Sequence, residues 1–148
     1  MAGAWEVFTP PAVAALLQQL RGQTLGLGNA IWLLERDPCA PELNARRLSG
    51  PLQPVVCRTH LNRGYRLAFT TQPAAPHHAQ RVVILYVGER DTRNRARDIW
   101  SVLHDLFGVP NPPEGHLLPH CCADGLPAID EDTLAAFERR LARLVRGR

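Results

Sequence analysis

The most hydrophobic stretch of the chain is a continuous apolar run from Val82 to Val87. Its length and its β-branched residues are typical of a strand that is covered on both faces. Gly88 follows it and is expected to turn the backbone out of the sheet. Apolar residues then recur at helical spacing from Arg93 to Phe107. The pattern therefore predicts a buried strand followed at once by an amphipathic helix.

The N-terminal part shows a short strand pattern and then two helix patterns. Apolar and polar residues alternate from Trp5 to Phe8, and Thr9 and Pro10 provide a cap and a first-turn proline for a helix. Gly22 is expected to end this helix. A second helix is predicted from Thr24 to Arg36. Because the link between the two helices is short, we expect them to form an antiparallel hairpin on one face of the sheet.

Two further strands are predicted in the middle of the chain, at Val55 to Leu61 and at Tyr65 to Thr70, joined by a tight turn. Side chains alternate between the faces of a strand, so Arg58 and His60 share one face of the first strand. Arg66 of the second strand can lie on the same face. The sequence thus predicts a basic face on an antiparallel sheet.

The C-terminal part differs in composition. Residues 111–128 are rich in proline and are expected to wrap over the surface, and an amphipathic helix then follows to about Val145. We expect residues 1–108 to form the main domain and residues 109–148 to pack on it as a helical extension. The predicted fold class is α+β, with two N-terminal helices on a small, mainly antiparallel, four-stranded sheet.

Length and composition favour a single domain with a substantial core, since 45% of the 148 residues are hydrophobic. The longest apolar run is far shorter than the roughly 20 residues that a membrane-spanning helix needs. The N-terminus also lacks the pattern of a signal peptide. We therefore expect a cytoplasmic protein that does not bind membranes.

The four cysteines show no disulfide-framework spacing, so free thiols are expected in the cytoplasm. Cys121 and Cys122 lie close to His116 and His120 in the sequence. Adjacent cysteines rarely ligate one tetrahedral metal, and no paired Cys-x-x-Cys motif is present. The neighbouring pair His77 and His78 is expected to be exposed in a loop. The sequence therefore predicts neither a metal site nor a cofactor.

All 17 basic residues are arginine, and their distribution is uneven. The segment from Arg46 to Arg97 holds ten arginines and two acidic residues, a net charge of +8, so the rest of the chain carries −5 of the total of +3. Arginine binds phosphate through a planar fork of donors. A basic middle within an acidic frame indicates a localised anion-binding face.

The order of one strand, two helices and three antiparallel strands resembles the RelE/ParE superfamily of toxins from toxin–antitoxin systems. The motifs that carry the likeness are Arg-Leu-Ser-Gly-Pro-Leu at 47–52, Gly-Tyr-Arg-Leu-Ala-Phe at 64–69, and Gly-Glu-Arg at 88–90. The likeness covers about residues 5–97. It implies either an mRNA endonuclease that acts on the ribosome or, in the ParE branch, an inhibitor of DNA gyrase. Glu89 stands where the family typically has a histidine, and a tyrosine usual a few residues later is absent.

Metal-free RNA cleavage requires a base for the 2′-OH, cations around the phosphorus, and an acid for the departing oxygen. Arg58, Arg66 and Arg90 are expected to hold the scissile phosphate, with Arg66 at the position that the likeness assigns to this role. His60 is the proton-transfer candidate because its unperturbed pKa lies near neutrality. Glu89 is a second candidate base, although an ion pair with an arginine explains it equally well.

Six other arginines are expected to contact the RNA backbone. Such contacts are strongly salt dependent and carry little sequence information. They are Arg46, Arg47, Arg63, Arg93, Arg95 and Arg97. A cognate antitoxin is the expected protein partner and mRNA the expected substrate. The alternative is a non-catalytic ParE-like toxin or a protein-binding module on the same fold.

Overall fold

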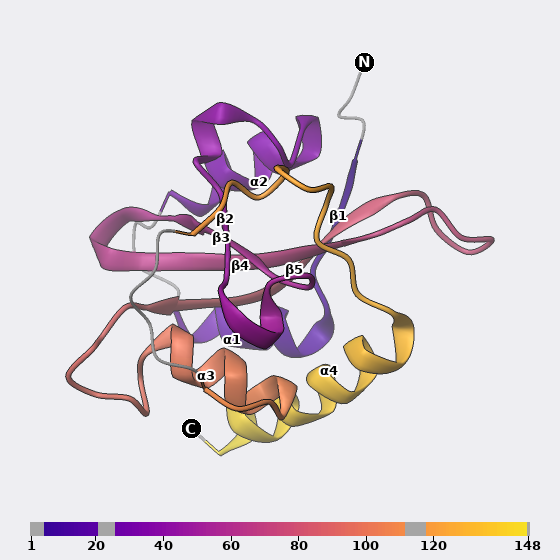
Figure 1. Cartoon of the computed structure of the whole chain (residues 1–148). Helices are drawn as coiled ribbons and strands as arrows, with labels where there is room; N and C mark the ends of the chain where they lie inside the picture. Colours follow the sequence, from indigo (N-terminus) through magenta and orange to yellow (C-terminus); the bar gives the residue numbers. More distant parts are fainter. Residues whose placement is uncertain (1–4, 21–25, 112–117, 148) are drawn as a thin grey trace.

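The computed structural model of the chain describes residues 5–20, 26–111 and 118–147 (Figure 1). None of the helices in these ranges is both long and apolar enough to cross a membrane. Helices and short 3₁₀ turns (η) alternate with strands along the chain. Their order is β1 (Glu6–Phe8), α1 (Pro11–Gln19), α2 (Leu27–Arg36), η1 (Pro41–Leu43), β2 (Arg46–Arg47), η2 (Gly50–Leu52), β3 (Cys57–His60), η3 (Asn62–Gly64), β4 (Tyr65–Gln72), β5 (Arg81–Glu89), α3 (Ile99–Phe107) and α4 (Glu131–Arg146).

The strands form one mixed sheet in the order β1-β5-β4-β3-β2. β1 runs parallel to β5, and every other neighbouring pair is antiparallel. The general α+β class is as predicted, but the sheet has five strands instead of four. The additional strand is β2, whose Arg46 pairs with Arg58 at the edge of the sheet. Two residues are too few to produce a recognisable alternation pattern, so the sequence indicated only a loop there.

The two N-terminal helices do not pair with each other as the sequence suggested. α1 packs mainly against α4 and β5, whereas α2 packs against β1 and η1. α4 also contacts α3, and the three helices α1, α3 and α4 lie together below the sheet in Figure 1. The apolar face of α1 packs against α4, which is distant in the sequence. The short link between the two predicted helices therefore pointed to the wrong partner. Gly22 and the predicted start of the second helix at Thr24 lie outside the described residues.

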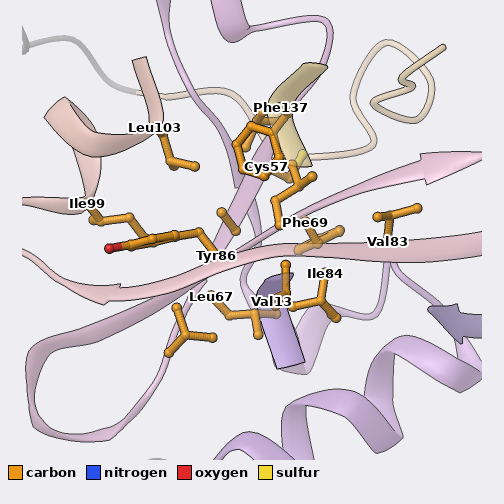
Figure 2. Close-up of a cluster of buried hydrophobic side chains, with 14 of the residues drawn as sticks. Val13, Cys57, Leu67, Phe69, Val83, Ile84, Tyr86, Ile99, Leu103 and Phe137 are labelled. Carbon is orange, nitrogen blue, oxygen red and sulfur yellow. The ribbon is translucent and has the colours of Figure 1, made fainter. Parts of the chain in front are cut away.

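β5 forms the centre of the core, with every residue from Val82 to Gly88 buried. Tyr86 lies beside Ile99 and Leu103 of α3, and Val13 of α1 lies near Leu67 and Ile84 (Figure 2). Gly88 was expected to end the strand, but it lies within β5 and pairs with Arg66. A Cβ atom at Gly88 would lie only 2.6 Å from a ring carbon of Tyr86. The glycine therefore makes room for the tyrosine ring instead of turning the chain.

α3 begins at Ile99, six residues later than the pattern predicted. Residues 90–98 are a loop, and Asp98 occupies the N-cap position of α3. Arg93, Arg95 and Arg97 are exposed in this loop. Arginine favours a helix by propensity, but these exposed side chains do not bury an apolar face that would stabilise a helix here.

All four cysteines are paired, which corrects the expectation of free thiols. Cys39 bonds to Cys122, and Cys57 bonds to Cys121, across 83 and 64 residues of sequence. Together with the backbone hydrogen bond from the Cys121 N–H to the Ala45 carbonyl, they fasten the segment after residue 118 to the β2 edge of the sheet. Adjacent cysteines thus serve two separate bonds, an arrangement that sequence spacing did not indicate.

Candidate anion-binding pocket

Three predicted site residues share one face of the sheet. His60 pairs with Arg66 across β3 and β4, Arg66 pairs with Gly88 across β4 and β5, and Arg58 lies two residues before His60. Residues directly opposite in an antiparallel sheet point to the same side, as do residues two apart in one strand. The alternation pattern of the sequence therefore placed these three side chains correctly relative to one another.

Arg90 reaches the same place from the loop that follows β5. Its backbone N–H donates to the Gly64 carbonyl at 3.2 Å, which ties the loop to the β3–β4 turn. Its guanidinium forms an ion pair with Asp98 Oδ2, while Asp98 Oδ1 accepts the Asp91 backbone N–H at 2.8 Å. The Asp98 side chain is only 6% exposed. One buried carboxylate thus fixes both the loop and the direction of Arg90.

These side chains line a pocket of about 200 Å³. Its polar wall consists of three guanidinium groups and one imidazole. Its apolar wall comes from the start of α3, from the segment after β2, and from Leu118. The lining residues are Leu48, Arg58, His60, Arg66, Arg90, Ile99, Trp100, Leu103 and Leu118. The apolar wall lowers the effective dielectric constant in the pocket, which strengthens the attraction between the guanidinium groups and an anion.

Arg66 is held at the mouth of the β3–β4 turn. Its Nη1 donates to the Gly64 carbonyl at 2.9 Å and to the Tyr65 carbonyl at 3.2 Å. Backbone contacts of this kind restrict the side chain before any ligand arrives. The loss of side-chain entropy on binding is correspondingly smaller.

The electrostatics of the pocket act on His60. Partial burial lowers the pKa of its imidazole below the usual value near 6.5, and the positive charges of Arg66 and Arg58 lower it further. His60 is therefore neutral at pH 7 and has a nitrogen lone pair available. A neutral imidazole next to cations can accept a proton from a bound hydroxyl group.

Glu89 does not belong to this pocket, contrary to its prediction as a catalytic residue. It pairs with Tyr65, one position away from the Arg66–Gly88 pair, and so lies on the opposite side of the strands. Its carboxylate forms an ion pair with Arg97 at 2.7 Å. Both residues line a different groove, next to Leu16 and Leu144. The ion-pair reading of Glu89 is the one that the structure supports.

The six arginines predicted to bind RNA have different surroundings. Arg47 is buried, and its guanidinium donates to the carbonyls of Cys121 at 2.8 Å, Gln53 at 2.9 Å, and Gly125. Burial lowers its pKa, although Asp124 raises it in part. Arg47 is therefore a structural clamp for the C-terminal segment and is not positioned to bind RNA.

The other five arginines reach solvent to different degrees. Arg46 is half-buried, with long contacts of 3.4 Å to the Leu118 carbonyl and 3.5 Å to Asn44 Oδ1. Arg63, in the turn between β3 and β4, is exposed, as are the loop residues Arg93, Arg95 and Arg97. These residues flank the sheet end that carries the pocket. Their role as backbone contacts stays a prediction.

Two residues of the site were not recognised from the sequence. Asp98 was read as an ordinary helix residue, although an aspartate directly before an apolar helical stripe is a recognised N-cap signal. Trp100 belongs to the apolar stripe of the helix predicted from Arg93 to Phe107, which indicates a core residue. It is indeed 7% exposed, yet it also lines the pocket. The sequence held a usable signal for Asp98, whereas the second role of Trp100 depends on where α3 begins.

Comparisons with protein-family models, with curated proteins and with solved structures give no match to this chain. The chemistry of the pocket is therefore the basis for a functional conclusion. The pocket offers cations in a fixed arrangement, one neutral proton acceptor and an apolar wall. Among its lining residues, His60 is the only side chain of a type that commonly ligates metals. The arrangement suits an anionic phosphate ligand that is bound without a metal in this pocket.

Proposed function

We propose that this protein is a RelE-like toxin that binds mRNA at the Arg58–Arg66–Arg90 pocket and cleaves it without a metal ion. The observation that carries the proposal is the convergence of three arginines and a neutral histidine in one pocket, although they come from three separate segments. Three guanidinium groups that line one pocket give it a positive potential, which attracts a phosphodiester. The RelE-like part of the proposal rests on the sequence motifs at residues 47–52, 64–69 and 88–90.

In the proposed reaction, His60 accepts the proton of a ribose 2′-OH. The 2′-oxygen then attacks phosphorus, the bond from phosphorus to the 5′-oxygen breaks, and the products are a 2′,3′-cyclic phosphate and a 5′-hydroxyl end. The three arginines stabilise the negative charge on the non-bridging oxygens in the transition state. Arginine does not release protons near neutral pH. Water or protonated His60 therefore supplies the proton to the departing oxygen.

The biological setting is part of the same proposal. A cognate antitoxin would cover the basic face with a helix or a strand, and cleavage would take place in the cytoplasm, on ribosome-bound mRNA. The two disulfides bear on this setting, because such bonds persist mainly in oxidising surroundings. The proposed cytoplasmic setting therefore requires that the fold persists when both bonds are reduced.

A second candidate is a ParE-like toxin or protein-binding module that uses the same face without cleavage. The specific observation in its favour is the placement of Glu89. This residue occupies the position of the family's closing histidine, but it is paired with Arg97 outside the pocket. The pocket therefore has His60 as its single candidate for proton transfer, among the residues that line it.

The test measures binding and cleavage of a labelled single-stranded RNA by the wild type and three variants. Arg66→Ala removes a pocket cation, and Arg63→Ala removes an exposed cation three residues away as the matched control. We expect Arg66→Ala to lower the cleavage rate by about 10²- to 10³-fold, and Arg63→Ala by less than about threefold. His60→Gln is expected to retain RNA binding and to lose about 10²- to 10⁴-fold in rate.

The outcomes separate the two candidates. Binding that depends on Arg66, without cleavage by any form of the protein, would remove the nuclease proposal and leave the binding module. If Arg66→Ala and Arg63→Ala changed RNA binding and cleavage equally, the pocket would not be the site of either candidate function. Growth arrest on expression with intact mRNA and gyrase-dependent DNA damage would favour the ParE-like function. Circular dichroism of each variant shows that a lost activity does not come from unfolding.

A further inference from the structure

Three potential metal ligands meet at the far end of the β4–β5 hairpin. They are His77 and His78, in the loop between the two strands, and Glu131, the first residue of α4. One potential ligand atom from each residue lies within 4.8 Å of those of the other two. His77 Nε2 is 3.0 Å from Glu131 Oε1. The chain thus joins residues more than 50 positions apart into a His-His-Glu set.

The tautomer of His78 suits ligation. Its Nδ1 is 2.7 Å from the Ala79 carbonyl oxygen, and a carbonyl only accepts, so Nδ1 carries the proton. In the neutral ring, Nε2 then carries the lone pair. Histidines that ligate metals usually donate their other ring N–H to a carbonyl or carboxylate in this manner, which fixes the orientation of the ring. The rings of His77 and His78 stand edge to face, with centroids 4.6 Å apart.

We propose that His77, His78 and Glu131 form a zinc site that connects the β4–β5 loop to the start of α4. Bond lengths of about 2.0–2.1 Å at a tetrahedral zinc place neighbouring ligand atoms roughly 3.3 Å apart. The His77–Glu131 separation is already close to this value, and zinc would displace the proton that His77 Nε2 donates to the carboxylate; the remaining ligand atoms need to move by less than about 2 Å. The side chains of His77 and Glu131 are 63% and 68% exposed, so such a movement meets little packing resistance.

The local charges favour a cation despite the helix terminus. The N-terminal end of α4 carries partial positive charge, which opposes a bound metal ion. Asp130, Glu131 and Asp132 outweigh it with three carboxylates. Asp130 caps the helix by accepting from the Thr133 N–H at 2.7 Å, and this leaves Glu131 to face the histidines. Two imidazoles and one carboxylate suit zinc and similar transition metals better than magnesium or calcium.

This inference does not depend on the proposed function. The Arg66–Gly88 pair marks the pocket end of the β4–β5 hairpin, whereas the Gln72–Arg81 pair marks the end next to the metal ligands. The zinc site would hold the loop against α4 and leave a fourth coordination position for water. The proposals of RNA cleavage and of zinc binding can therefore be tested independently of each other.

The test is calorimetric titration of Zn²⁺ into the 148-residue chain without an affinity tag. The protein is kept oxidised, so that Cys39, Cys57, Cys121 and Cys122 stay in disulfides and cannot bind the metal as thiolates. We expect one zinc ion per chain. His78→Ala and Glu131→Gln should each weaken binding at least about tenfold. His120→Ala is the matched control, because this histidine lies in a different pocket, and it should bind zinc like the wild type.

Thermal unfolding provides a second readout on the same proteins. Zinc should raise the midpoint of the wild type and of His120→Ala, but not that of Glu131→Gln, because a ligand that binds only the folded state stabilises it. Magnesium should have no effect on any of them. The proposal is overturned if the wild type binds no zinc at 100-fold molar excess, or if His78→Ala and Glu131→Gln bind as tightly as the wild type. In either case, His77 and Glu131 form only a surface contact.

Discussion

Arg90 and Asp98 form an ion pair that bridges the loop between β5 and α3, with 22% and 6% of their side chains exposed. Asp98 also accepts the Asp91 backbone N–H, so the carboxylate anchors the loop at two points. Arg90 itself borders the pocket. The start of α3 thereby determines where a cation of the candidate site lies, which connects helix capping to phosphate binding.

We predict that Asp98→Asn lowers the free energy of unfolding by about 2 kcal/mol, because a hydrogen bond to a charged group is lost in a buried place. The RNA cleavage rate should fall about tenfold, since Arg90 is no longer fixed. RNA affinity at low salt should not fall, because the pocket gains net positive charge. Urea denaturation and single-turnover kinetics measure these effects. Asp105→Asn, on the exposed side of α3, is the control; equal behaviour of the two variants would contradict the prediction.

The second prediction concerns the titration of His60. Burial first, and then Arg66 and Arg58, lower its pKa, so in Arg66→Ala this pKa should rise toward 6.5 but stay below it. The unfolded chain takes up this proton at higher pH than the folded chain does. The contribution of His60 to stability is therefore complete above about pH 6.5 and is lost as the pH falls through the lower folded value.

Proton NMR of the imidazole Cε1–H signals checks this titration. Arg63→Ala should leave the pKa of His60 unchanged, because Arg63 is not among the causes of the shift. The His60→Gln variant identifies the signal by its disappearance. A pKa at or above 6.5 in the wild type, or no change in Arg66→Ala, would contradict the arrangement of charges that makes His60 a base.

Much of the pocket could be predicted from the sequence, because strand alternation is a local and strict rule. It placed Arg58 and His60 on one face and allowed Arg66 beside them. The same rule places Glu89 on the opposite face from Gly88 and Arg66, since adjacent residues in a strand point to opposite faces. The family likeness nevertheless grouped Glu89 with the site. Alternation was the better guide here.

The remaining features depended on contacts between distant segments. The pairing of α1 with α4, the two disulfides and the β2 edge all join parts of the chain that no periodicity connects. Arg47 illustrates this limit of sequence patterns. A buried arginine that binds carbonyl groups and an exposed arginine that contacts RNA cannot be distinguished from the residue type alone. Only the carbonyl groups around its guanidinium distinguish them.

The third prediction therefore separates Arg47 from Arg46. Arg47→Met should lower the free energy of unfolding by at least about 3 kcal/mol, because three carbonyl groups lose their donors. Arg46→Met removes only long, partly exposed contacts and should cost less than about 1 kcal/mol. Urea denaturation measures both. If Arg47→Met weakened RNA binding while its stability stayed that of the wild type, the clamp role would be wrong.

The fourth prediction concerns the two disulfides. Each closes a long loop, so removing either one should lower the free energy of unfolding by about 2–4 kcal/mol. Cys57 and Cys121 are fully buried, and the paired variant Cys57→Ser/Cys121→Ser should lose more than Cys39→Ser/Cys122→Ser, because it also buries hydroxyl groups. Denaturation of the wild type with and without a reductant provides the comparison. A midpoint that does not respond to the reductant would contradict this prediction.

The fifth prediction uses the close approach of Gly88 to Tyr86. In Gly88→Ala the new methyl group would lie 2.6 Å from a carbon of the Tyr86 ring, and this ring is buried beside Ile99 (Figure 2). The ring must move, so the free energy of unfolding should fall by about 1–3 kcal/mol. The wall of the pocket that Ile99 and Trp100 provide should shift with it, and RNA cleavage should slow.

Gly28→Ala is the matched control for the same chemical change. Gly28 lies in α2 with nothing within 4 Å of the added Cβ atom, so alanine should stabilise the helix by about 0.5–1 kcal/mol. Thermal unfolding of both variants therefore gives shifts of opposite sign. Stabilisation by Gly88→Ala would mean that the Tyr86 ring is loosely packed, and α3 would then not be held over the pocket as the structure shows.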